Sequence, residues 1–245
     1  MKIGINQPYF FPYIGFWQLM NAVDKYVIAD NLHYMKKGFV NRNSILINGE
    51  AKSFRVPIQK ASQNKLICEL EIGLDEAEIS KLLNSVKCAY AKAPFFQETY
   101  NLIENCLEFG LTDEGKNLGK FLEYSIRRTA EKLGIETTIL LASSDVHLDD
   151  DYKREHYIVA TCKKLEGTEY YNAIGGTKLY CQKFFRENNL GLSFVKANSD
   201  IKYKQFKKDE FVPNLSIIDI MMFCSKDEIA DLLKQYTLEK GFESF

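Results

Sequence analysis

The eleven residues Gln7–Trp17 constrain the fold of this chain most strongly, because they place two prolines and many large aromatic side chains directly after an apolar start. That start, Met1–Asn6, has the pattern of a strand. Proline fixes φ and lacks a backbone N–H, so the segment forms neither a regular helix nor a central strand. Two interpretations stay open. The segment is a rigid aromatic plug that ties the amino terminus to the core, or it lines a pocket, since ligands of open α/β sheets bind beyond the carboxyl ends of strands.

The elements that follow favour the pocket. Residues 16–23 have the spacing of a short amphipathic helix, and residues 25–30 form a strand pattern that ends on the carboxylate of Asp30. In a unit of strand, loop, helix and strand, the two strands pair in parallel. We therefore expect the aromatic loop and Asp30 to emerge at the same edge of a sheet.

The rest of the chain predicts an α/β fold with a mainly parallel sheet, flanking helices and a helical insertion in the middle of the chain. A hairpin is expected about Asn48–Gly49, because these residues tolerate positive φ. A helical layer is expected at about 75–133, its last helix starting at Thr112 as the cap. The remaining predicted elements are strands at 136–142, 169–173 and 192–196 and helices at 150–165, 178–186, 216–223 and 226–236.

Composition is that of a soluble globular protein: 245 residues, 46% hydrophobic, 27% charged and a net charge of -1. No linker-like stretch divides the chain, so residues 1–245 are expected to form a single domain. We expect a cytoplasmic protein with no membrane span, because no apolar run is long enough and no secretory signal is present. Balanced charge also argues against a nucleic-acid partner.

The segment after Asp30 gathers polar and cationic side chains between two predicted sheet elements. His33 and Lys36 come first, and Asn41, Arg42 and Asn43 follow. The arginine fork suits carboxylate or phosphate, and the amides suit hydroxyl groups, so an anionic, hydroxylated ligand would fit this set. The alternative is a solvated turn with Arg42 in a surface ion pair.

A second candidate segment contains Asn172 and the pair Gly175 and Gly176, where a strand should hand over to a helix. Free N–H groups at a helix start bind phosphate, and glycines allow close approach. The spacing matches no nucleotide-binding motif, so a plain tight turn is the alternative.

No metal site or cofactor is identified in the sequence. His147, Asp149–Asp151 and His156 invite a metal reading, but the acids precede a predicted helix, where they favour its amino terminus without any ion. The six cysteines are scattered and form no Cys-x-x-Cys pair, and most are expected to be buried. A thiol-dependent enzyme is a third reading, although no cysteine stands beside a histidine in a telling way.

Four separated motifs resemble the WbqC-like family. They are Asn6–Trp17, Asp30 with Lys36 and Asn41–Asn43, Asn172–Gly176 and Pro213–Asp219. The resemblance implies a role in bacterial cell-surface glycan synthesis of the O-antigen type. It also implies a small-molecule substrate, expected to be a nucleotide sugar, and partner enzymes of glycan assembly.

The same resemblance limits the chemistry. Family members often carry His or Ser where this chain has Asn6, which cannot shuttle protons. The loop is also similar to that of nucleotidyltransferases with a His-x-Gly-His signature, but Tyr13 and Phe16 replace both histidines. Nucleotidyl transfer of that type is therefore not expected.

The function expected from these observations is acyl or aminoacyl transfer to a nucleotide-activated amino sugar. A non-catalytic binding or assembly module is the alternative. Asp30 and His33 are the candidates for proton transfer, and Lys36 completes the expected catalytic set. The expected substrate-binding residues are Gln7, Tyr9, Tyr13, Trp17, Asn41, Arg42, Asn43, Asn172, Gly175 and Gly176.

Overall fold

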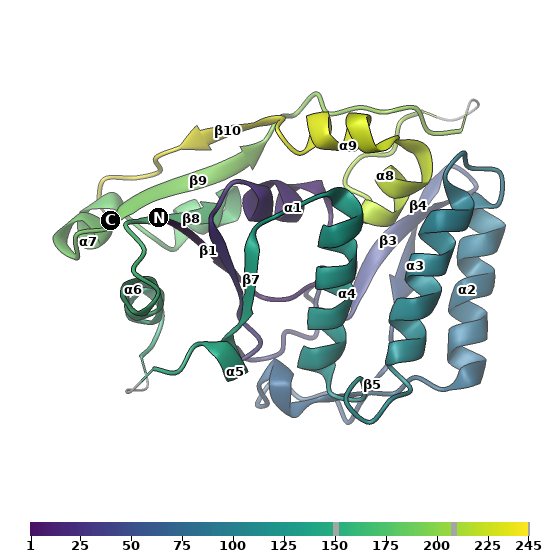
Figure 1. Ribbon diagram of the computed structural model, residues 1–245, viewed down its shortest axis with the longest axis horizontal. Coiled ribbons are helices and arrows are strands. Elements are labelled where there is room, and N and C mark those ends of the chain that lie inside the picture. The colour runs from purple at the N-terminus through teal and green to yellow at the C-terminus, as the bar shows by residue number, and fades with distance from the viewer. Residues whose placement is uncertain (149–151, 207–209, 245) are drawn as a thin grey trace.

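A six-stranded sheet in the order β10-β9-β8-β1-β2-β7 forms the centre of the computed structural model, which describes residues 1–148, 152–206 and 210–244 (Figure 1). The strands are β1 (Lys2–Asn6), β2 (Lys25–Ile28), β7 (Thr138–Leu141), β8 (Glu169–Ala173), β9 (Gly191–Ala197) and β10 (Tyr236–Glu239). All neighbours pair in parallel except β10, which runs antiparallel to β9. The predicted α/β class with a mainly parallel sheet is confirmed.

Helices cover both faces of the sheet, as Figure 1 shows. One face packs against α1 (Ile14–Asn21), and α4 (Leu118–Leu133), α8 (Ile217–Phe223) and α9 (Lys226–Leu232) extend the hydrophobic core on that side. The other packs against α5 (Ala142–Asp145), α6 (Glu155–Lys164) and α7 (Gln182–Glu187). Alternation along the strands explains this division, since Ile3 and Ile5 point to the α6 side whereas Tyr26 and Ile28 point to the α1 side.

The long connection from β2 to β7 forms a further layer beyond α4. It contains α2 (Glu76–Tyr90), α3 (Phe96–Phe109), the hairpin β3 (Arg42–Ile47) and β4 (Glu50–Arg55), the strands β5 (Ile58–Gln59) and β6 (Glu71–Ile72), and the 3-10 helix η1 (Ile67–Glu69). Asn48 and Gly49 turn the hairpin with φ of 53° and 79°, so the predicted turn is confirmed.

Three of the predicted boundaries that differ from the structure have clear causes. The helix expected from Thr112 begins at Leu118, because Asn117 accepts the N–H of Lys120 as its cap, and the Thr112 hydroxyl instead accepts the N–H of Gly115. The helix expected from 178 begins at Gln182, because the 3-10 helix η2 (Ile174–Lys178) intervenes. The last helix stops at Leu232, and the residues expected to extend it to 236 lead into β10.

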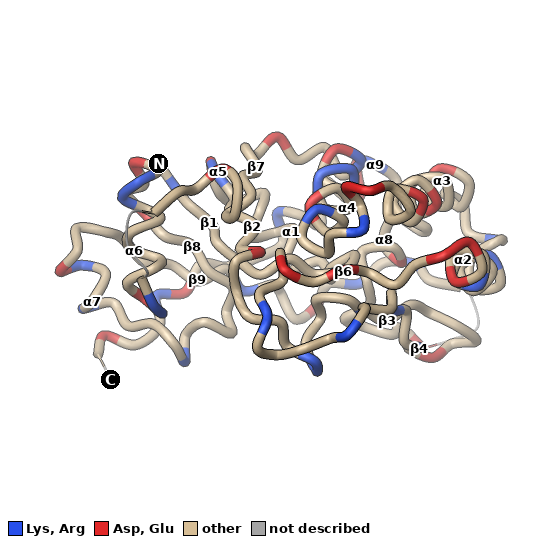
Figure 2. The backbone as a smooth tube through the Cα atoms, turned by 90° about the horizontal axis from the view of Figure 1, so that it is seen from below, with Lys and Arg blue, Asp and Glu red and all other residues tan. Residues whose placement is uncertain are grey.

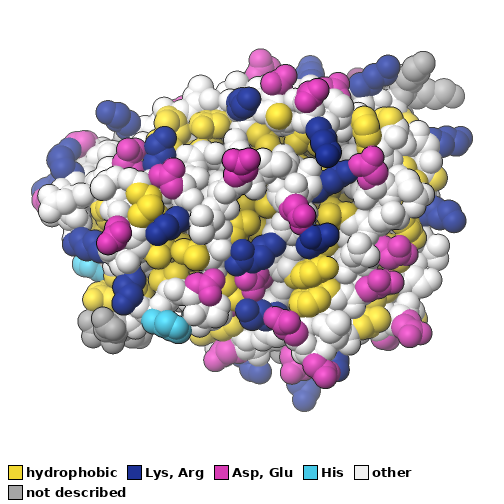
Figure 3. Space-filling model, in the orientation of Figure 1, with side chains coloured by type: hydrophobic (Ala, Val, Ile, Leu, Met, Phe, Trp, Pro, Cys, Tyr) yellow, Lys and Arg dark blue, Asp and Glu magenta, His cyan; other side chains and the backbone are white. Residues whose placement is uncertain are grey.

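Acidic and basic residues are mixed along the chain (Figure 2) and on the face that Figure 3 shows. Figure 2 shows acidic and basic positions interspersed along the backbone, and Figure 3 shows the same mixture with small apolar patches between them. No helix in the described part of the chain is long and apolar enough to cross a bilayer.

Candidate functional site

A cavity of about 800 Å³ opens at the carboxyl edge of the parallel strands, on the face that carries α6. Segments from five places in the sequence line it: the residues after β2, Leu66, the residues after β7, the start of α6 and Tyr180. Its lining residues include Asn31, His33, Ser143, His147, Lys153, Arg154, Tyr157 and Tyr180. Ligand-binding clefts of proteins fall in this size range, and open α/β sheets place them at this edge.

Two hydrogen bonds join Asp30 to Ser143 at this cavity. The Ser143 N–H donates to Asp30 Oδ1 over 2.9 Å, and the Ser143 hydroxyl donates to Asp30 Oδ2 over 2.5 Å. Asp30 is only 1% exposed, whereas Ser143 is exposed. Burial raises the pKa of the Asp30 carboxyl, and the two bonds from Ser143 oppose that rise.

Parallel pairing explains why these two residues meet. Ile28 and Leu141, the last residues of β2 and β7, are register partners, so the positions two residues further on also lie side by side. The sequence predicts both strands, at 25–30 and 136–142, but it does not show that the two are neighbours in the sheet. Ser143 was missed because only Asp30 and the aromatic loop were placed at the carboxyl ends of strands.

Two histidines lie at the cavity. His33, a predicted site residue, lines it together with His147, which was considered only as a metal ligand. Gln7 lies next to this rim, because its side-chain amide donates to the His33 carbonyl over 3.4 Å.

The α6 side of the cavity adds phenol rings and cations. The Tyr157 hydroxyl donates to Asn31 Oδ1 over 3.1 Å, which orients both polar groups at the cavity wall. Lys153 and Arg154 lie just before α6. Sequence reasoning missed this wall, because Tyr157 follows the helical spacing of a core residue. Asp149–Asp151, predicted as caps of this helix, lie outside the described residues.

The aromatic loop combines both interpretations of its sequence. Phe10, Phe11 and Trp17 are buried, and the Trp17 indole N–H donates to the Pro12 carbonyl over 2.9 Å. The structure therefore places Trp17, at 0% exposure, in the core and not on a ligand-facing surface. Tyr9 and Tyr13 are half-buried.

Tyr9 and Tyr13 both pack against Phe39. The ring centroids lie 5.7 and 6.0 Å from that of Phe39, which is 46% exposed. We call these three residues the aromatic platform. Burial, together with the nearby Tyr13, raises the pKa of Tyr9 to about 12, so its hydroxyl is neutral at physiological pH.

Buried side chains hold the loop in a strained conformation. Phe11 has φ of 41°, which is uncommon for a residue with a β-carbon. Its carbonyl accepts from the Asn43 amide over 2.9 Å and from the Ser216 hydroxyl over 2.7 Å. The strain persists because these side chains fix the backbone from two directions.

The predicted Asn41–Asn43 cluster has mostly structural contacts. Asn41 is buried and bonds Tyr34 and the Val56 carbonyl. The Arg42 guanidinium donates to the carbonyls of Lys37 and Gly38 at 2.5 and 3.0 Å, which closes the turn that carries the exposed Lys36. Both hydrogen bonds of the Arg42 side chain therefore stabilise the backbone of this turn.

The Gly175–Gly176 corner lies at the end of β8, within η2, so no α-helix begins there. Gly175 is exposed and Gly176 is buried. The Asn172 side chain accepts the N–H of Ala173 over 2.7 Å and lies directly against Gly176. Through Tyr180, the segment after this corner reaches the cavity.

Gly176→Ala is expected to lower the free energy of unfolding by about 1–3 kcal/mol, the usual cost of overpacking. A β-carbon at Gly176 would lie 2.4 Å from Asn172 Nδ2 and 3.3 Å from the Phe194 ring. Gly175→Ala is the matched control, because nothing lies within 4 Å of a β-carbon there. Urea unfolding of both variants measures the difference. Equal stability of the two would contradict the close approach at Gly176.

The cysteines offer no activated thiol in the core. All six are free, and burial raises the pKa of Cys106, Cys162 and Cys224 to about 12. A catalytic thiol needs the opposite shift. In the described part of the chain, no three His, Cys, Asp or Glu side chains gather closely enough to hold a metal ion.

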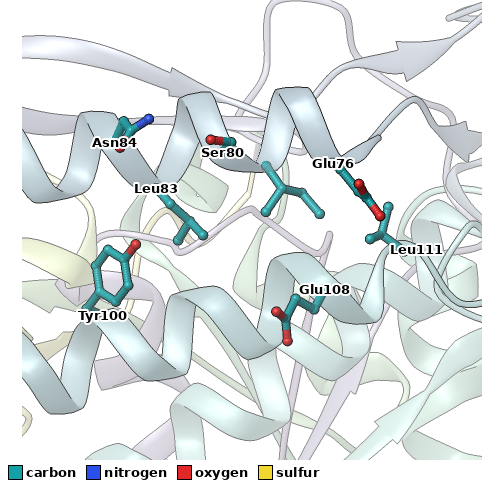
Figure 4. Close-up of a pocket in the computed structure, with 8 residues that line it drawn as sticks. Glu76, Ser80, Leu83, Asn84, Tyr100, Glu108 and Leu111 are labelled. Carbon is teal, nitrogen blue, oxygen red and sulfur yellow. The ribbon is translucent and has the colours of Figure 1, made fainter.

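A second cavity, of about 370 Å³, lies between α2 and α3. Leu83 of α2 and Tyr100 of α3 point toward one another there, with Glu76 and Glu108 nearby (Figure 4). This groove contains neither a strand end nor one of the sequence motifs. The cavity at the sheet edge is therefore the candidate functional site.

The sequence was also compared with models of known protein families. The sequence model of the WbqC-like protein family matches residues 7–231, a range that includes the aromatic loop, Asp30, Ser143 and Asp219. The chain belongs to the WbqC-like protein family. It is 25% identical over 222 residues to the uncharacterized protein Rv1507c of Mycobacterium tuberculosis, a similarity that covers 90% of this chain and 92% of that protein. No solved structure matches this WbqC-like chain.

Proposed function

We propose that this protein is a transferase of bacterial cell-surface glycan synthesis that transfers an acyl or aminoacyl group to a nucleotide-activated amino sugar. One observation carries the proposal. The cavity at the sheet edge combines imidazoles, phenols and cations with a serine whose hydroxyl is bonded to a buried carboxylate. Membership of the WbqC-like family agrees with it.

Each part of such a substrate has a counterpart in the cavity lining. Tyr157 and Tyr180 offer ring surfaces for a base or a sugar. Lys153 and Arg154 offer charge for a diphosphate, and His33 offers an imidazole that can donate or accept a hydrogen bond. In this proposal Arg154 takes the anion-binding role that the sequence suggested for Arg42, because the Arg42 guanidinium donates its hydrogen bonds to the backbone carbonyls of Lys37 and Gly38.

Arg154→Ala is expected to weaken nucleotide-sugar binding by about 10- to 100-fold, the effect of removing a hydrogen bond to a charged group. Calorimetric titration with a panel of nucleotide sugars measures the dissociation constants, and titration with the matching nucleosides, which lack the diphosphate, gives the comparison. Arg186→Ala is the control, because Arg186 forms a surface ion pair with Glu243. Arg42→Ala is expected to change the affinity less than Arg154→Ala does. Absence of binding across the panel, or equal binding by wild type and Arg154→Ala, would contradict the proposal.

A non-catalytic binding module is the second candidate, and the aromatic platform favours it. Phe39 and the neighbouring Met35, 56% exposed, extend an apolar surface beside Tyr9 and Tyr13. This candidate predicts binding without turnover. Incubation of a bound nucleotide amino sugar with acyl donors separates the two, since only the transferase forms an N-acylated product.

A further inference from the structure

Ser143 and Asp30 are arranged as a hydroxyl nucleophile with its base. A serine hydroxyl is a weak nucleophile until a base within hydrogen-bond distance takes its proton. The Ser143 Oγ to Asp30 Oδ2 distance of 2.5 Å meets this condition. Ser143 is exposed at the cavity, whereas Asp30 lies behind it at 1% exposure. A substrate in the cavity therefore meets the hydroxyl before the carboxylate.

The carboxylate is held rigidly in place. Its other oxygen accepts the Ser143 N–H, and the Asp30 carbonyl accepts the N–H of Cys68 over 2.9 Å. Helix α4 also approaches the carboxylate closely, since a β-carbon on Gly119 would lie 3.0 Å from Asp30 Oδ2, the oxygen that accepts the Ser143 hydroxyl. A group fixed from several directions keeps its geometry during a reaction.

We infer that Ser143 is a nucleophile that carries the acyl group as an ester, with Asp30 as its general base; this inference rests on the proposed function. Ser143 Oγ attacks the carbonyl carbon of an activated acyl donor of the thioester or reactive-ester class. Its proton passes to Asp30 and from there to the donor's thiol or alcohol, which leaves. The amine of the sugar then attacks the ester carbonyl and gives a proton to Asp30, the C–N bond forms, the bond between the acyl carbon and Ser143 Oγ breaks, and Oγ regains that proton from Asp30.

A purely structural role for this contact makes a different prediction. Acceptance of the Ser143 N–H by Asp30 would fix the turn after β7 whether or not the hydroxyl reacts. Ser143→Ala retains that backbone bond and removes only the hydroxyl. Ser144 provides a matched control, because it is exposed one residue away and donates to Asp145 Oδ1 over 3.0 Å, at the surface.

The test is acyl capture from p-nitrophenyl acetate by the full-length protein. We expect a burst of p-nitrophenol equal to the amount of protein and one acetyl group on the peptide that contains Ser143. Ser143→Ala should abolish both, Ser144→Ala should match the wild type, and Asp30→Asn should slow the burst by about 100-fold or more, the range of general-base catalysis. Ser143→Cys should restore capture, because a thiol at this place retains a nucleophile.

Folding of each variant is checked by thermal unfolding, and Asp30→Glu, which keeps a carboxylate, replaces Asp30→Asn if the latter unfolds. Acetyl groups found only on lysines, or an equal burst in Ser143→Ala, would overturn the inference. If the wild-type protein binds nucleotide sugars but captures no acetyl group, the assignment of Ser143 as a nucleophile is wrong and the proposed acceptor still stands. Capture at Ser143 without any nucleotide-sugar binding would support the nucleophile and contradict the proposed acceptor.

Discussion

Asp219→Ala is expected to lower the free energy of unfolding by about 3–5 kcal/mol, because it leaves buried donors without an acceptor. Asp219 lies in α8 at 0% exposure. Its carboxylate accepts from the hydroxyls of Tyr90 and Tyr203 at 2.8 and 2.5 Å and from the Gln205 amide at 2.8 Å. These partners come from α2 and from the segment before α8, so the loss affects packing between three parts of the chain.

Urea unfolding followed by circular dichroism measures this effect. Tyr203→Phe is the graded control, since it removes one of the three bonds and is expected to cost about 1 kcal/mol. If Asp219→Ala were no less stable than Tyr203→Phe, the three bonds would not act together on this carboxylate, and the account of Asp219 as a structural anchor would be wrong.

Asn43→Ala is expected to lower the free energy of unfolding by about 2–4 kcal/mol and to loosen the aromatic loop. The Asn43 amide donates to the carbonyls of Phe10 and Phe11, and its oxygen accepts the N–H of Ser44. Without these bonds, less of the surrounding structure holds Phe11 at its strained φ of 41°.

Hydrogen exchange at the backbone amides of residues 9–13 reports the loosening directly, because exchange follows local opening. Ser216→Ala removes a single bond to the same Phe11 carbonyl and should cause a smaller change in the same direction. Faster exchange in Ser216→Ala than in Asn43→Ala would show that α8, not β3, is the main support of the loop.

The fold was largely predictable from local patterns. Apolar alternation located β8 at its observed bounds, and the Asn48–Gly49 pair located the hairpin, because both signals act within a few residues. Boundaries failed where distant contacts decide. The residues of β10 are too few and too exposed to indicate a strand by themselves, and they become one by pairing with β9.

The candidate site was predictable only in part. Asp30 was predicted as a carboxylate at a strand end and His33 as a side chain suited to proton transfer, and the structure places both at or against the cavity. Asn41, Asn43 and Trp17 were predicted to bind substrate from their chemistry alone, but sequence does not tell whether an amide or an indole faces a ligand or its own backbone. Ser143 and Tyr157 join the cavity through tertiary contacts that no local pattern encodes.

The strands that lead to Asp30 and Ser143, β2 and β7, are neighbours in the sheet, yet residues 29–137 separate them along the chain. Closing a loop of that length costs on the order of 4 kcal/mol of chain entropy, and contacts across it form late in folding. The hydroxyl and its carboxylate therefore come together only in a molecule whose α2–α4 and hairpin layer has already assembled. Acyl capture at this pair would consequently report complete folding, because a partly folded intermediate would give no signal.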